Sequence, residues 1–341
     1  MFNYALREKV MSQITSDILM ISPVKFRYNE QTATNNYYQK VLGNFSKEEV
    51  QEKSLSEFNQ LVKKLKSAGV NVIVINDTEN PDTPDSIFPN NWVSFHEDGL
   101  VGLYPMCAKN RRDERREDIF DELVDKYSFF IKEIKDFTSF EKRNKFLEGT
   151  GSMVLDRVHK ICYAAISIRT DEIAVMQFCE EFGYSPVCFT SNQYVNGERM
   201  PIYHTNVMMC VADKFVVICL DTIDDEQEKK HVVETIIKTG KEIIEINEEQ
   251  KNRFAGNMLQ VAGDKNYLVM SNSAFSCLNQ KQKSAIVKYC EIIFILSLIA
   301  FSFSNLGGCD SKTNKPPIIK KLEHLIKYSS KLYFVLLSNV E

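Results

Sequence analysis

The sequence predicts an α/β protein built from a repeated unit of hairpin, helix and strand. Four pairs of short apolar runs, each split by a polar turn, recur along the chain, and a helical pattern follows each pair. Small or amide residues precede each pair, and steps of 60, 55 and 51 residues separate the anchors Asn91, Gly151, Asn206 and Asn257. Repeats of this period are typical of propellers and solenoids. Because each unit contains a helix, a pure β-propeller fits poorly. An α/β protein whose hairpins resemble one another by chance stays open as the alternative.

The hairpins are predicted from apolar runs that flank turn residues. The first turn, His-Glu-Asp-Gly, contains the strong turn dipeptide Asp-Gly. The paired runs are 92–95 with 100–104, 152–155 with 161–166, 207–211 with 215–220, and 258–261 with 267–270. Helices are expected at about 114–126, 171–183, 225–239 and 278–289, and β-rich runs at 185–190 and 241–246.

The repeat fails at its fifth instance. One more step beyond Asn257 reaches Cys309, but the residues that follow, DSKTNKPP, do not form a hairpin pattern. We therefore assign residues 1–290 to the repeat domain, with an N-terminal strand, and 291–341 to a divergent tail where the fifth unit is expected. The apolar run 292–303 is too short to span a bilayer and predicts a buried strand or helix.

Composition excludes several function classes. The net charge of −4 gives no general case for binding nucleic acid or an anionic membrane. The nine cysteines show no C-x-x-C spacing, which argues against a disulfide framework or a structural zinc site and favours a reducing cytosol. The N-terminus has no apolar core typical of a signal peptide. We expect a cytoplasmic protein.

The segments before the hairpins carry the candidate chemistry, because they would converge on one site if the units close into a ring. His204 is suited to general acid–base catalysis, although a lone histidine is more often structural. Asp85 and Glu148 are candidate site carboxylates, or a turn cap and a strand end respectively. The cluster NRRDERR (110–116) suits the bidentate binding of a carboxylate, or is a solvated helix start.

Six motifs in order resemble the guanidine-modifying, or amidinotransferase-like, superfamily. They are DSIFPNNW (85–92), NRRDERR (110–116), LEGTGSMVLDR (147–157), SIRT (167–170), HTNVM (204–208) and FAGNMLQV (254–261). Within the superfamily they look closest to the arginine-deiminase-related group that contains citrulline hydrolases, with the dimethylarginine dimethylaminohydrolases as a more distant match. The resemblance runs from about residue 17 to about residue 289.

The resemblance implies a five-bladed α/β propeller of ββαβ units, with the fifth blade incomplete or altered in this chain. It implies a cysteine nucleophile near the C-terminus that attacks a guanidino or ureido carbon. No metal or organic cofactor is implied. By position, His204 matches the general acid–base, Glu148 matches an acidic residue of the second blade, and Cys309 alone stands near the place of the nucleophile.

The resemblance also implies an amino-acid substrate. Arg112 and Arg115 of the arginine cluster match residues that hold its α-carboxylate. Asp85 and Asn91 are expected to contact its ureido end. The remaining candidate substrate-binding residues are Phe88, Asn206 and Asn257. A homodimer stays open.

Three departures from arginine deiminases bear on the substrate. Those enzymes have carboxylates where this chain has Asn91, Gly151 and Asn206. A guanidinium is permanently charged and calls for carboxylates, whereas amides suit a neutral ureido group. The departures favour citrulline, cleaved to ornithine, carbon dioxide and ammonia. Hydrolysis of dimethylarginine or arginine is the alternative within the same class.

The tail is the other departure. The family closes on G-G-G-S-x-R-C, but here only Leu-Gly-Gly-Cys309 stands near that place. If the tail has lost the nucleophile, the chain is an inactive amino-acid-binding homologue of the same fold. Cys107, Cys162 and Cys210 lie in or beside predicted strands and are interpreted as inert thiols.

Overall fold

Five three-stranded sheets share one strand order in the computed structural model, which describes residues 11–36, 46–295 and 335–337. In each sheet the middle strand pairs antiparallel with one neighbour and parallel with the other. The sheets, in hydrogen-bonded order, are β3 (Val93–Phe95), β4 (Leu100–Leu103) and β5 (Glu133–Asp136); β6 (Met153–Asp156), β7 (Ile161–Ala165) and β8 (Ser185–Phe189); β11 (Met209–Val211), β12 (Phe215–Ile218) and β13 (Glu242–Glu245); β14 (Leu259–Ala262), β15 (Asn266–Ser271) and β16 (Glu291–Ile295); and β17 (Val335–Leu337), β1 (Asp17–Ser22) and β2 (Asn71–Asn76).

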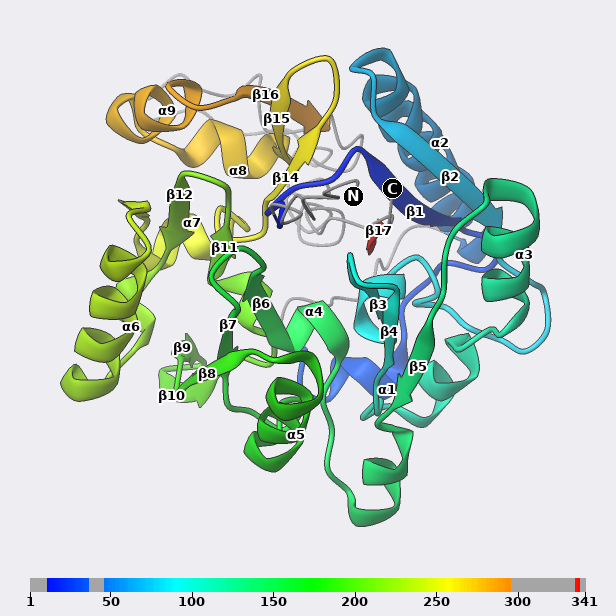
Figure 1. Ribbon diagram of the computed structural model, residues 1–341, viewed down its shortest axis with the longest axis horizontal. Coiled ribbons are helices and arrows are strands. Elements are labelled where there is room, and N and C mark those ends of the chain that lie inside the picture. The colour runs from blue at the N-terminus through cyan, green and yellow to red at the C-terminus, as the bar shows by residue number, and fades with distance from the viewer. Residues whose placement is uncertain (1–10, 37–45, 296–334, 338–341) are drawn as a thin grey trace, which may run out of the picture.

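A helical crossover joins the two parallel strands of each sheet, as parallel pairing requires. Figure 1 shows the sheets arranged around the middle of the molecule, with these helices on the outside. The crossover helices are α2 (Lys47–Ser67), α3 (Asp118–Tyr127), α5 (Glu172–Phe182), α6 (Glu226–Lys238), and the pair α8 (Asn272–Cys277) and α9 (Gln280–Val287). The expected hairpins and helices are therefore confirmed, to within a few residues at their ends.

The crossover helices other than α3 begin at side-chain caps that the sequence supplies. Ser46 and Glu49 form a capping box on α2, and Asn279 and Gln282 form one on α9. Such caps satisfy backbone N–H groups that have no partner within the helix. β12, the middle strand of its sheet, is buried along its whole length, as is typical of strands that are packed on both faces.

The fifth sheet joins the two ends of the described chain. β1 and β2 pair in parallel around α2, and β17 adds antiparallel to β1 through Asp17 opposite Leu337. This gives the sheet the same strand order as the other four. Residues 296–334 lie outside the described residues. They include most of the predicted tail and the end of the apolar run 292–303. The boundary at residue 290 stays a prediction.

Smaller elements complete the described fold. The hairpin of β9 (Asn192–Val195) and β10 (Glu198–Pro201) follows β8, and α7 (Glu248–Asn252) follows β13; neither was predicted. The remaining short helices are α1 (Glu30–Ala33), α4 (Gly149–Ser152), η1 (Pro89–Asn91), η2 (Lys109–Glu114), η3 (Thr138–Arg143), η4 (Thr205–Val207) and η5 (Leu220–Thr222). Within these described residues, no helix is long and apolar enough to cross a lipid bilayer.

Candidate active site

Three of the segments that precede hairpins fold into single helical turns that pack together. α4 contacts both η1 and η4. Two glycines allow this approach. Gly149 has a φ of +45°, and a Cβ there would lie 2.3 Å from the carbonyl oxygen of Asn90. A Cβ on Gly151 would lie 2.5 Å from Asn91 Nδ2 and 2.8 Å from His204 Nδ1. Two of the predicted site residues, Asn91 and His204, thus lie close together around Gly151.

Glu148 and His204 form a buried pair at this meeting point. The carboxylate Oε2 of Glu148 accepts a hydrogen bond of 2.7 Å from Nε2 of His204, and both side chains are almost fully buried. Oε1 of Glu148 accepts from the backbone N–H of Cys107 at 3.1 Å. Burial by itself would raise the pKa of Glu148, but Arg169, His204 and Arg111 together hold it well below its usual range. Glu148 is therefore a carboxylate at neutral pH.

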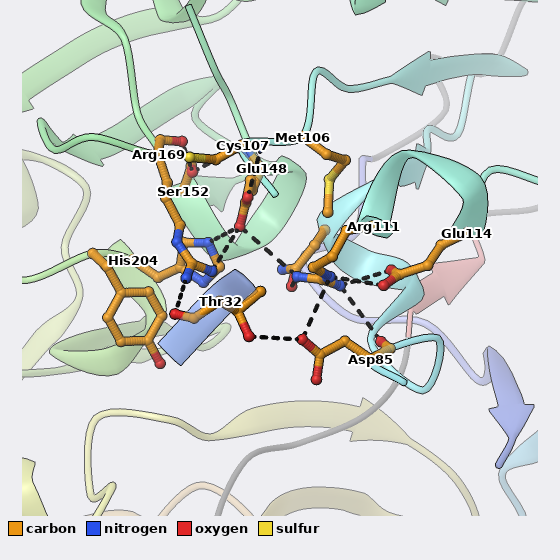
Figure 2. A network of polar contacts seen from close by, with 12 residues as sticks. Thr32, Asp85, Met106, Cys107, Arg111, Glu114, Glu148, Ser152, Arg169 and His204 are labelled. Carbon is orange, nitrogen blue, oxygen red and sulfur yellow. Dashed lines mark hydrogen bonds and ion pairs between the residues drawn. The ribbon is translucent and has the colours of Figure 1, made fainter. Parts of the chain in front are cut away.

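Two buried arginines converge on Glu148, as Figure 2 shows. Nη1 of Arg169 lies 3.2 Å from Glu148 Oε2, and Nη1 of Arg111 lies 3.8 Å from the same oxygen. Each arginine is 2% exposed, so its charge must be balanced inside the protein. Arg169 also donates to the carbonyl oxygen of Thr32 at 2.9 Å and to Oδ1 of Asn35 at 2.8 Å.

Glu114 is the second carboxylate on Arg111. Nε and Nη2 of Arg111 donate to Oε1 and Oε2 of Glu114, both at 2.8 Å, so the pair is bidentate. Burial alone would lower the pKa of Arg111, but Glu114, Asp85 and Glu148 raise it. Burial also raises the pKa of Glu114. Both oxygens of Glu114 nevertheless accept an N–H from Arg111, which is the contact of an ionised carboxylate. In a protonated carboxyl group, one oxygen would carry an O–H that faces an arginine N–H, and two donors would then oppose each other.

Asp85 lies on the opposite side of Arg111 from Glu148. Its Oδ2 accepts from Asn29 Nδ2 at 2.8 Å and from Thr32 Oγ1 at 3.1 Å, and it lies 3.9 Å from Arg111 Nε. Its other oxygen, Oδ1, is buried and accepts no hydrogen bond in the described part of the chain. The segment around α1, from Asn29 to Asn35, therefore links Asp85 to Arg169.

Arg112 and Arg115 lie together beside a different carboxylate. Arg112 Nε is 3.3 Å and Arg115 Nη1 is 2.6 Å from Glu141, and each also donates to a backbone carbonyl. The 3₁₀ turn of η2 explains this separation, because residues three apart share a face of such a helix. Arg111 and Glu114 share the inner face, and Arg112 and Arg115 share another. Their predicted contact with a substrate carboxylate stays a prediction.

The other predicted substrate-binding residues lie around this network. The Phe88 ring is buried, with the Arg111 guanidinium 5.9 Å from its centroid. Asn257 Nδ2 donates to the carbonyl oxygen of Asn206 at 2.9 Å. Asn206 and Asn257 also line a cavity of about 110 Å³ between β6, β11 and β14. The described lining of that cavity does not include Glu148 or His204.

Three thiols in the described chain, Cys107, Cys162 and Cys210, were predicted to be inert, and all three lie wholly or partly inside the protein. Burial, together with Glu148, raises the pKa of the half-buried Cys107 thiol, and burial raises that of Cys210 to about 12. Cys162 is fully buried. Cys309 lies outside the described residues. No group of three or more His, Cys, Asp or Glu side chains within residues 11–36 and 46–295 is arranged to hold a metal ion.

Sequence reasoning missed several residues of this network. Arg111 stood in the arginine cluster, and its spacing of three from Glu114 was the available signal. Arg169 stood in the quoted SIRT motif but was given no role. Asn29 and Thr32 carried no signal, since their contacts cross more than 50 residues of chain.

This arrangement can move a proton next to a small polar substrate. A histidine held by a buried carboxylate is the usual form of a general acid–base, and the carboxylate orients the ring. The Nδ1 side of His204 faces Gly151 and Asn91. The two buried arginines next to the pair are each engaged by a carboxylate of the protein, Arg111 by Glu114 and Arg169 by Glu148.

Comparisons with solved structures place the fold among arginine-modifying enzymes. The N-terminal domain of ArgZ, an arginine dihydrolase from the ornithine–ammonia cycle in cyanobacteria, was solved as a cysteine-to-serine mutant bound to substrate. It is 16% identical at a TM-score of 0.61, covering 82% of this chain and 90% of that one. A cysteine-to-alanine mutant of AgrE, solved in complex with L-arginine, is 15% identical in sequence at a TM-score of 0.62. The match covers 82% of this chain and 37% of that one.

Another similar structure is a dimethylarginine dimethylaminohydrolase, solved as the adduct of a histidine-to-glycine variant with S-methyl-L-thiocitrulline. It is 15% identical at a TM-score of 0.55, covering 83% of this chain and 92% of that one. At such identities these likenesses show the mixed α/β fold alone. A comparison with curated protein sequences gives no match.

A family model decides the relationship. The model for eukaryotic N,N dimethylarginine dimethylhydrolase matches residues 22–298. The resemblance to the amidinotransferase-like superfamily is confirmed, and the matching family belongs to the group that sequence analysis placed further away. Because the match spans most of the chain, the protein belongs to the eukaryotic N,N-dimethylarginine dimethylhydrolase family, a family of amidino-group hydrolases.

Proposed function

We propose that this chain hydrolyses a C–N bond of a ureido group in a free amino acid, with citrulline as its preferred substrate. The observation that carries the proposal is the buried Glu148–His204 pair beside the amide of Asn91. The pair supplies proton transfer, and the neutral amide suits a neutral reacting group. The family match supports the hydrolase class.

The proposed reaction uses Cys309 as the nucleophile. Its thiolate adds to the ureido carbon, the bond from that carbon to the terminal nitrogen breaks, and His204 delivers the proton that lets ammonia leave. Water, deprotonated by His204, then adds to the same carbon and expels the thiolate. The carbamic acid that remains splits into ornithine and carbon dioxide. Glu148 orients His204 and stabilises its charged form.

Substrate contacts are proposed from the same network. Asp85 and Asn91 lie at the reacting end, and Phe88 lines it. Arg112 and Arg115 remain the predicted partners of the α-carboxylate.

The arginine and dimethylarginine alternatives fit the comparisons equally well. ArgZ is an arginine dihydrolase, and the matching family is described by dimethylarginine. The choice of citrulline rests on Asn91 and Gly151, neither of which offers a carboxylate beside His204. Asn206 adds a third neutral position.

Product analysis with the purified protein tests the proposal. Citrulline, arginine and dimethylarginine are supplied separately, and ornithine, ammonia and methylamines are measured. Faster ammonia release from arginine than from citrulline would show that the choice of substrate is wrong. His204→Asn should abolish turnover of whichever substrate is used.

An inactive binding homologue is the alternative of a different class. A ureido or amidino analogue with an electrophilic carbon, followed by peptide mass mapping, separates the two. Labelling of Cys309 that is lost in Cys309→Ser supports the enzyme. Amino-acid binding without any labelled cysteine supports the binding homologue.

We also infer that the five sheets are the blades of a five-bladed α/β propeller. The repeated strand order and the pairing of β17 with β1 support this inference. The cytoplasmic location and the homodimer stay predictions.

A further inference from the structure

Arg111 fixes which atom of the Asn91 amide faces it. Nη1 of Arg111 donates to Oδ1 of Asn91 at 2.8 Å. A guanidinium carries only donors, so the amide atom at this distance must be the oxygen. The NH₂ group of Asn91 must then point the other way, toward Gly151 and the Nδ1 side of His204.

Glu114 in turn fixes Arg111. It engages Nε and Nη2 with both of its oxygens at 2.8 Å, which leaves Nη1 for Asn91. Two other carboxylates compete for the guanidinium, Glu148 at 3.8 Å and Asp85 at 3.9 Å. The bidentate contact with Glu114 is shorter than either, and its planar geometry leaves the fork one orientation.

We propose that Glu114 and Arg111 are positioning residues that hold the Asn91 amide with its NH₂ toward the reacting group of the substrate, and thereby select a ureido oxygen over a guanidinium. The inference deepens the proposed function and rests on it for the substrate class. A ureido carbonyl accepts from the NH₂ of Asn91. A guanidinium has no acceptor, so its N–H groups would face the NH₂ donor of Asn91 without forming a hydrogen bond.

The site is built for one orientation of this amide. Asn91 is 5% exposed, so an amide that flips loses its bond to Arg111 and gains no water in exchange. With Glu114 lost, Arg111 can turn toward Glu148 or Asp85 and release Asn91. The released amide can then present its oxygen, which accepts from a guanidinium.

Binding calorimetry with L-citrulline and L-arginine tests the proposal. The wild-type protein should bind citrulline more tightly. Glu114→Gln keeps the shape but offers Arg111 one acceptor in place of two, and should shift the ratio of the two dissociation constants toward arginine by about tenfold. The control is Glu141→Gln, which also removes a carboxylate from arginines. Because both ligands carry the same α-carboxylate, Glu141→Gln should leave the ratio unchanged within about twofold.

Two results would overturn the inference. One is an unchanged ratio in a folded Glu114→Gln protein, and the other is an equal shift in Glu141→Gln. If Glu114→Gln does not fold, Asn91→Asp replaces it. This isosteric change removes the donor, so it should weaken citrulline binding at least about tenfold; unaltered citrulline binding would contradict the proposed orientation.

A ligand-free measurement separates this inference from the proposed function. If the wild-type protein binds neither amino acid, the proposed function fails, yet the orientation is still testable by NMR. The Asn91 NH₂ protons, assigned by their loss in Asn91→Ser, should show a nuclear Overhauser effect to the α-protons of Gly151. Absence of this effect in the wild-type protein, or its full persistence in Glu114→Gln, would refute the role given to Glu114.

Discussion

Adding one methyl group at Gly151 should disable the site while leaving the fold in place. The new Cβ would lie 2.5 Å from Asn91 Nδ2 and 2.8 Å from His204 Nδ1, whereas ordinary contacts begin at 3.4 Å. His204 must therefore retreat by about 0.6 Å and Asn91 by about 0.9 Å. A misplacement near 1 Å costs on the order of 100-fold in rate, so we expect kcat to fall about 100-fold.

Gly102→Ala is a matched control for the cost of overpacking. Gly102 lies in the β3–β4 pair, and a Cβ there would lie 2.5 Å from the hydroxyl of Tyr104, with Ser94 as its other near neighbour. Neither glycine needs a left-handed backbone, so alanine itself is tolerated at both positions. Each variant should lose about 1–3 kcal/mol of unfolding free energy.

The assay compares turnover and stability for the two variants. Urea unfolding gives the free energies, and ornithine release from citrulline gives kcat. Only Gly151→Ala should lose activity. If Gly151→Ala keeps kcat within about threefold of wild type, or if Gly102→Ala loses as much activity, the contact of Gly151 with His204 does not control the chemistry.

Three further outcomes are expected, each from urea unfolding. Glu148→Gln should lower the unfolding free energy by about 3 kcal/mol at pH 7, because buried arginines lose a shared carboxylate. Since the folded-state pKa of Glu148 is depressed, the wild-type advantage should be complete above about pH 4.3 and shrink at lower pH; a constant difference from pH 7 to 3 would contradict this. Burial holds the pKa of His96 well below its usual range, so wild type should lose up to about 1.4 kcal/mol per pH unit below about pH 6.5. The His96→Gln variant should lack this loss of stability. The control variant His231→Gln, at an exposed histidine, should retain it. Ser46→Ala removes the capping box of α2 and should cost about 1 kcal/mol at any pH; no change would mean that α2 does not depend on its cap.

The sequence by itself determined the repeated unit and the segments that carry the site. Hairpins, crossover helices and caps follow from apolar runs, turn residues and cap residues that act within about 50 residues of chain. The glycines and amides before the hairpins could also be recognised from the local sequence. Glycine permits close backbone approach, and an amide side chain makes polar contacts. His204 and Glu148 were found because each stands at such a segment.

Only the tertiary structure decided which side chains meet. The 3₁₀ conformation of η2 places Arg111, and not its neighbour Arg112, in the buried network around Glu148. The charge pattern of the sequence does not reveal this conformation. Asn29 reaches Asp85 across 56 residues, and Arg169 reaches Asn35 across 134. The fifth sheet joins β1 to β17 from opposite ends of the chain. Such partners are selected by the shape and charge balance of the folded interior, because apolar and charged residue patterns fix what a side chain needs but not which distant residue provides it.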